Sequence, residues 1–168
     1  MAKHFEIPDD YLTELLGRVR AGNLVTVHES GPQATLVPFH METHKTGQVL
    51  VTHLMRNNPQ AVEPVTGPAL VIIDIDDAYV SPAWYATNKD LPNVPTWDYI
   101  TIHVTGEVRF TADPGAALEA ARELTSRMEP PEVLEAVGEE KLRTMARAIV
   151  RAEIAVEKIQ GKAKASQN

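Results

Sequence analysis

One short segment combines residue types that bind anions with a spacing that would bring them together. Thr52–Pro59 reads Thr-His-Leu-Met-Arg-Asn-Asn-Pro, with Asn58 suited to the N-cap of a helix and Pro59 to its first residue. Backbone N–H groups at a helix start face an anion, and Arg56 adds a planar guanidinium that matches phosphate. The segment predicts a phosphate site, although a capped helix beside a surface arginine is the simpler interpretation of these residues alone.

A second feature is a concentration of aromatic side chains in two neighbouring segments. Ala78–Tyr85 and Val94–Tyr99 hold both Trp and three of the four Tyr of a chain that is only 5% aromatic. Flat side chains on a proline-containing connection suit a planar ligand or a partner subunit. A small aromatic cluster that covers one end of a barrel is an equally good interpretation.

The end of the chain is basic and polar. Lys158, Lys162 and Lys164 could reach a phosphate, with Ser166 and Gln167 able to hydrogen-bond nearby. Chain ends of this composition are usually solvated, so a solvated terminus is the alternative.

Two acidic and histidine-rich segments could in principle hold a metal. His40, Glu42 and His44 would share one face of a strand, but they fall beside a predicted hairpin turn, which favours exposed turn residues. Asp74–Asp77 lacks the glycine and the distal glutamate of a calcium loop, which favours a solvated strand end. We therefore expect no metal site and name no catalytic residue.

Composition narrows the class of protein. The 168 residues, 43% of them hydrophobic, predict a single domain over residues 1–168. The net charge of −7 and the lack of a basic recognition helix make direct DNA binding unfavourable. Without cysteine, an apolar leader or a run of about 18 apolar residues, the chain is expected to be cytoplasmic, with no membrane span.

The hydrophobic patterns predict a mainly β protein with peripheral helices. Strands are expected at 24–28, 33–39, 48–54, 69–75, 99–110 and 150–156, and helices at 8–20, 113–128 and 139–148. The continuous apolar run 69–75 suggests a strand buried on both faces. Gly106 interrupts an alternating strand and predicts a bulge or a close backbone approach. Six alternating strands favour a small antiparallel barrel.

With these segments assembled, the chain resembles the PaiB-type family of FMN-binding negative transcriptional regulators. The resemblance is carried by five segments: Ala34–Phe39, Val51–Pro59 with its His-x-x-Arg-x-Asn-Pro core, Ala78–Tyr85, Val94–Tyr99 and Gly161–Asn168. The chain departs from the pattern at Arg151, where the family more often has Gly.

The resemblance implies an FMN-binding split β-barrel that works as a homodimer, with the flavin at the subunit interface. It assigns Arg56, Asn57 and Asn58 to the FMN phosphate, helped by Lys162 and Lys164. It places beside the flavin Val37, Pro38, Thr52, His53 and Leu54. It also implies that the second subunit covers the flavin, through Trp84, Tyr85, Thr96 and Trp97.

Three functions follow from these expectations. The leading hypothesis is an FMN-binding regulatory protein. The alternatives are a flavin-dependent oxidoreductase that acts on a small molecule and a split barrel that binds heme through one of the six His. The absorption spectrum of the purified protein separates a flavin from a heme, because the cofactor carries the chromophore.

Overall fold

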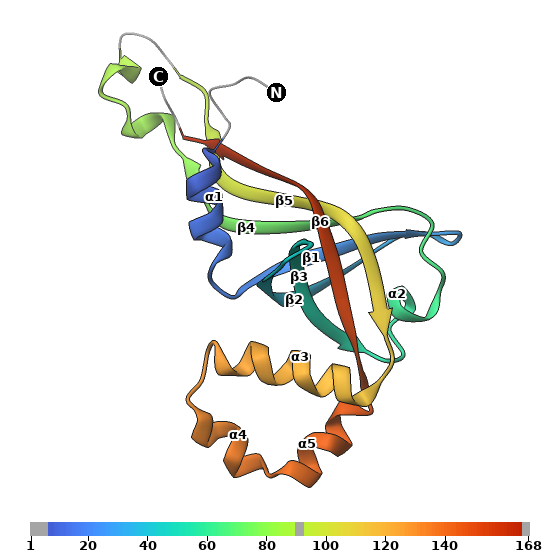
Figure 1. The fold of residues 1–168 in the computed structure, drawn as a ribbon. Coiled ribbons are helices and arrows are strands. Elements are labelled where there is room, and N and C mark those ends of the chain that lie inside the picture. Colours follow the sequence, from blue (N-terminus) through green and yellow to red (C-terminus); the bar gives the residue numbers. More distant parts are fainter. Residues whose placement is uncertain (1–6, 90–92, 166–168) are drawn as a thin grey trace.

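Six antiparallel strands form a ring in the computed structural model, which describes residues 7–89 and 93–165 (Figure 1). The strands are β1 (Arg20–His28), β2 (Gly31–His44), β3 (Gly47–Met55), β4 (Ala69–Val80), β5 (Thr96–Thr111) and β6 (Ile149–Lys164). They pair in the order β1-β2-β3-β6-β5-β4, and β4 pairs back with β1 through Asn23–Val25. The mainly β, antiparallel fold expected from the sequence is confirmed.

Most of the helices lie at the two ends of this ring (Figure 1). The helices are α1 (Asp9–Leu16), α2 (Pro59–Val62), α3 (Pro114–Ser126), α4 (Pro131–Val137) and α5 (Glu139–Ala146), with two 3-10 turns at Pro82–Trp84 and Ala86–Lys89. We call α3, α4 and α5 the helical arm, since together they connect β5 to β6. Figure 1 shows the helical arm at one end of the ring, and α1 with the 3-10 turns at the other. No helix in the described part of the chain is long and apolar enough to cross a membrane.

The core fills the inside of the ring, and strand alternation decides which residues enter it. On β5, Ile102 and Val104 are fully buried, whereas Thr105 and Glu107 face outward. Leu24 of β1 and Ile154 of β6 are also fully buried in this core. Burying each such side chain contributes about 1.5–3 kcal/mol, so the ring interior dominates stability.

Gly106 marks a bulge between β5 and β6, as the sequence predicts. The pairing register shifts between Thr105 and Gly106. A Cβ at Gly106 would lie 1.9 Å from the carbonyl oxygen of Ala155, so the strands meet there without room for a side chain.

Two helix predictions are corrected by the structure. The helix expected at 8–20 ends at Leu16, and Arg20 instead begins β1, opposite Phe39 of β2. Glycine at position 17 weakens a helix, and the following residues gain ladder hydrogen bonds in the ring. The structure also contains α4, which the sequence patterns did not predict and which begins at Pro131, a residue well suited to the first position of a helix.

The basic end of the chain is not a solvated tail as far as the structure describes it. β6 continues through Lys164, and Lys162 and Lys164 pair with Thr101 and Tyr99 of β5. Residues 166–168, including Ser166 and Gln167, lie outside the described residues. The polar composition does not predict a strand here, because these residues are ordered by backbone hydrogen bonds to β5.

β4 is buried on one face only within a single copy. Val71 and Ile73 are buried in the core, but Leu70 and Ile72 point outward and are half-buried. The expectation of two buried faces is therefore wrong for one chain alone, and apolar surface remains on the outside of the ring.

Candidate functional site

The predicted cap at the start of α2 is present. The Asn58 side chain accepts a hydrogen bond of 2.9 Å from the backbone N–H of Gln60, and its Nδ2 donates to Thr35 Oγ1 at 3.0 Å. Gln60 is buried and donates to Leu24 O and Thr26 Oγ1. These bonds fix the end of β3 and the single turn of α2 against β1 and β2.

Arg56 has a role that the sequence did not reveal. Its Nε donates to Arg147 O at 2.7 Å, and its Nη2 donates to Ala112 O at 2.8 Å and to Ile149 O at 3.3 Å. Ala112 precedes the helical arm, while Arg147 and Ile149 follow it. Arg56 therefore ties both ends of the helical arm to β3, and only its Nη1 has no hydrogen bond among the described residues.

The residues expected beside the flavin divide between the two faces of the ring. Val37 and Leu54 are buried in the core, so their side chains do not reach a ligand outside the ring. Thr52 pairs with Ala152 and is 1% exposed, and its Oγ1 has no hydrogen-bond partner among the described residues. Pro38 and His53 occupy the alternate, outward positions of β2 and β3.

Burial of His53 favours its neutral form. Burial lowers the pKa of His53 below its usual value. Its Nδ1 is buried and has no hydrogen-bond partner among the described residues. The imidazole therefore keeps a buried nitrogen without a hydrogen-bond partner on the outer face of β3.

The basic end of β6 meets the start of β5. Lys164 Nζ donates to Thr96 Oγ1 and, at 3.0 Å, to the carbonyl oxygen of Trp97. Lys162 Nζ lies 3.4 Å from His103 Nδ1. Burial, followed by the charge of Lys162, lowers the pKa of His103, and Asp74 partly offsets this. One predicted phosphate residue, Lys164, thus contacts two predicted flavin-covering residues, Thr96 and Trp97.

The aromatic side chains gather at this same end of the ring. Tyr79 contacts Trp84 and Trp97 with ring centroids 6.5 and 6.0 Å apart, and Trp97 Nε1 donates to Asp77 Oδ1 at 2.7 Å. Trp84 remains 71% exposed and Trp97 52% exposed. The Tyr85 hydroxyl is buried without a hydrogen-bond partner among the described residues. We call Tyr79, Trp84, Tyr85 and Trp97 the aromatic cluster.

The predicted phosphate residues do not form one site within a single copy. Arg56 bonds to Ile149 at the beginning of β6, whereas Lys162 and Lys164 lie at its end. At about 3.3 Å per residue, the 13 steps from Ile149 to Lys162 follow roughly 40 Å of strand. Asn57 and Asn58 lie with Arg56, and the aromatic cluster lies with the two lysines.

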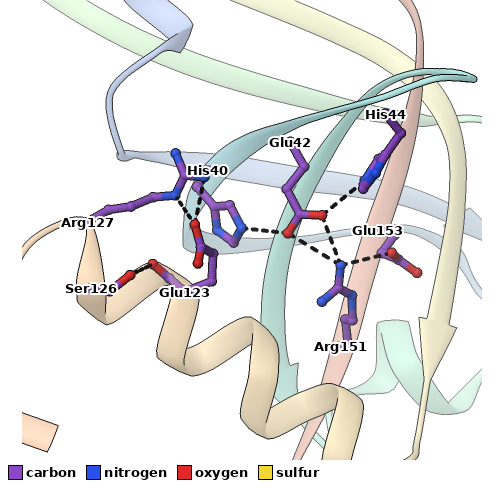
Figure 2. A network of polar contacts seen from close by, with 8 residues as sticks. All are labelled: His40, Glu42, His44, Glu123, Ser126, Arg127, Arg151 and Glu153. Carbon is purple, nitrogen blue, oxygen red and sulfur yellow. Dashed lines mark hydrogen bonds and ion pairs between the residues drawn. The ribbon is translucent and has the colours of Figure 1, made fainter.

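A polar network covers the outer face of β2 and β6 (Figure 2). Glu42 accepts from His40 Nε2 at 2.9 Å and from His44 Nε2 at 3.1 Å, and Arg151 Nη2 donates to the same carboxylate at 3.3 Å. Arg151 also pairs with Glu153 at 3.1 Å. Burial alone would raise the pKa of Glu42, but the His40 hydrogen bond and the Arg151 charge outweigh it and lower the pKa.

This network corrects the sequence interpretation of His40 and Glu42 as exposed turn residues, whereas His44 is exposed at the end of β2, beside the turn. The three side chains lie on β2, and His40 is 1% exposed. Arg151 donates a hydrogen bond to the Glu42 carboxylate, which is the group that a metal ion would need as a ligand. Across residues 7–89 and 93–165, no group of three or more His, Asp or Glu side chains is arranged to hold a metal ion.

Comparison with known proteins shows the family. The model of the family described as "Putative FMN-binding domain" matches residues 1–158. The chain belongs to this family. Its sequence is also 30% identical, over 159 residues, to the protease synthase and sporulation protein PAI 2 of Bacillus subtilis; the match covers 88% of this chain and 71% of that protein. The PaiB-type resemblance and FMN as the cofactor are thereby confirmed.

Solved structures confirm the fold. The flavocytochrome Anf3 of Azotobacter vinelandii superposes with a TM-score of 0.68 over 95% of this chain and 68% of that one, at 12% identity. The FAD and heme binding protein of Mycobacterium smegmatis superposes with a TM-score of 0.63 over 94% of this chain and 71% of that one, at 17% identity.

Proposed function

We propose that the protein binds FMN between two copies of the chain. The phosphate would lie between Arg56, Asn57 and Asn58 of one copy and Lys162 and Lys164 of the other. The observation that carries the proposal is the position of these two groups at opposite ends of β6. Since one chain does not bring them together, a joint site requires a second copy.

The outer surface of the ring supports a dimer. Leu36 of β2 is 66% exposed, and the pairing register places Asn23 and Ile72 in a row beside it. The adjoining row crosses Val25 and Leu70. An apolar patch across three strands of a small ring is typical of an interface between subunits.

The aromatic cluster supports the same arrangement. Trp84 and Trp97 expose large flat surfaces that the fold of one copy leaves uncovered. A flavin ring from the neighbouring site would cover them, with Thr96 held beside it by Lys164. The chain would thus supply a phosphate-binding end to one site and a flavin-covering end to the other.

Titration of flavin fluorescence tests this proposal. The double variant Lys162→Ala, Lys164→Ala removes two charged partners of the phosphate, each worth about 1.5–3 kcal/mol, so we expect FMN affinity to fall at least about tenfold. Lys141→Ala on α5 is the matched control and should bind FMN as the unchanged chain does. Equal affinity in the double variant, or a stable monomer by light scattering at micromolar concentration, would contradict the proposal.

Any gene regulation by this protein, we propose, acts through binding of a small molecule or another protein and not through DNA binding. The arginines of the helical arm are paired with carboxylates: Arg122 and Arg143 contact Glu139, and Arg127 contacts Glu123. With a net charge of −7, little free positive charge remains there for phosphodiesters. Sequence-dependent nanomolar retention of duplex DNA in a shift assay would refute this part.

A further inference from the structure

A cavity of about 510 Å³ lies between the helical arm and the ring. The cavity is lined by His53 and Met55 of β3, Leu118 of α3, Leu134 of α4 and Leu142 of α5. Its volume falls within the range of pockets that hold small organic molecules. Of the residues proposed to bind FMN, only His53 lines it among the described residues, so the two sites adjoin but do not coincide.

The cavity wall is almost entirely apolar. Only three lining side chains in the described part of the chain are polar, namely His53, Arg122 and Thr125. Arg122 pairs with Glu139, and Thr125 Oγ1 donates to Ala121 O at 2.8 Å. Among these three side chains, the buried polar atom without a hydrogen-bond partner in the described part of the chain is His53 Nδ1.

The cavity is held open by the way the helical arm is attached. Ala117, Ala120 and Leu124 of α3 are buried, and α3 contacts β2, β3 and β6. Arg56 binds the carbonyl groups on both sides of the arm, so the arm is fixed at its beginning and its end. A cavity between anchored walls retains its volume, whereas a loose gap would collapse.

We infer that this cavity binds a compact apolar organic molecule that carries one hydrogen-bonding group, and that this group meets the imidazole of His53, which lines the cavity. The lining residues come from three helices and two strands and surround one volume, which suits a small molecule better than an extended peptide or a flat protein surface. Met55 and Met145, 55% and 56% exposed, lie in the wall, and their flexible side chains can adapt to a ligand at the opening.

Methionine methyl signals test the site with built-in controls. We would label the methionine methyl groups with ¹³C and titrate the protein, without FMN, with 2-naphthol. Met55 and Met145 line the cavity, whereas Met41 packs on the ring core and Met128 lies outside. Saturable shifts confined to Met55 and Met145 are expected. No shift up to the solubility limit, or equal shifts of the Met41, Met55, Met128 and Met145 signals, overturns the inference.

Two variants on the helical arm sharpen the test. Ala121→Leu adds three carbons to the cavity wall and should abolish the 2-naphthol shifts. Ala136→Leu makes the same change on an exposed position of α4 outside the cavity and should leave them unchanged. Binding by the Ala121→Leu protein as strong as that of the unchanged chain would contradict the site.

The hydrogen-bonding role of His53 has its own readout. His53→Leu keeps the wall apolar and should weaken 2-naphthol about fivefold, the value of one hydrogen bond, while 2-methylnaphthalene binds unchanged. If His53→Leu weakened the binding of both probes equally, a hydrogen bond to His53 would have no part in recognition. If the Met55 and Met145 signals depend on protein concentration without any probe, a second copy fills the cavity and the inference fails. None of these readouts uses flavin, so they stand apart from the test of the FMN site.

Discussion

The two ends of β6 differ in how far one chain completes them. At the beginning of the strand, Arg56 satisfies three backbone carbonyls and closes the helical arm onto the ring. At its end, Trp84 and Trp97 are exposed and the Tyr85 hydroxyl has no partner among the described residues. At the first end, intramolecular bonds leave only Arg56 Nη1 without a hydrogen bond among the described residues, whereas the other end presents larger groups that a ligand or a second copy would satisfy.

Removing the Arg56 side chain should have the largest effect on stability. Arg56→Ala leaves the carbonyls of Ala112, Arg147 and Ile149 without this donor, so we expect a loss of about 2–4 kcal/mol in the free energy of unfolding. Urea denaturation measures it. Arg147→Ala is the control, because only its backbone carbonyl takes part, and it should change stability by less than about 0.5 kcal/mol. Similar losses in both proteins would show that the arm is held by other contacts.

The far end of β6 should be sensitive to added volume. A Cβ at Gly161 would lie 2.4 Å from Leu12 Cδ2 and 2.7 Å from Ile7 Cβ, so Gly161→Ala must displace Ile7 and the side chain of Leu12, which anchors α1. We expect a loss of about 1–3 kcal/mol, the usual cost of overpacking. Gly67→Ala is the control, since no atom lies within 4 Å of its Cβ position. A neutral Gly161→Ala would mean that α1 contributes little to the ring.

The aromatic cluster should matter for ligand binding more than for folding. Trp84→Ala is expected to weaken FMN about fivefold, the value of one aromatic contact, while the free energy of unfolding without FMN changes by less than about 1 kcal/mol. Val94→Ala changes another highly exposed apolar residue nearby and should leave FMN affinity unchanged. The reverse pattern, lower stability with unchanged affinity, would make the cluster purely structural.

The smallest expected effect is on pH dependence. Because burial lowers the pKa of His53, the unfolded chain binds a proton more readily, and stability should fall as the pH drops below the usual histidine value of about 6.5. His103 acts in the same direction, and Glu42 adds a loss at lower pH, below its usual carboxyl range. His53→Leu should make the urea midpoint less dependent on pH between 7 and 5. An unchanged slope would show that His53 titrates as it does in water.

The sequence predicted the ring better than the arrangement of the site. Alternating strands such as β5, the bulge at Gly106 and the Asn58 cap follow from local rules, and all three are present. The strand character of Lys162 and Lys164 was missed because pairing with β5, not composition, orders them. The Arg56 bonds were missed for a similar reason, since their acceptors are backbone carbonyls 56 to 93 residues away. A motif reveals a residue type, but only the fold shows which partners it meets.

Mixed dimers test the central claim, that each FMN site is built from two copies. One chain would carry Asn57→Asp, an exposed change that repels phosphate, and the other Lys162→Ala with Lys164→Ala. Either homodimer would then have two defective sites. The purified mixed dimer would have one site with both defects and one site with none, so we predict one FMN bound per dimer with the affinity of the unchanged protein. Two weak sites in the mixed dimer, each like those of the homodimers, would place the whole site within one chain and contradict the account.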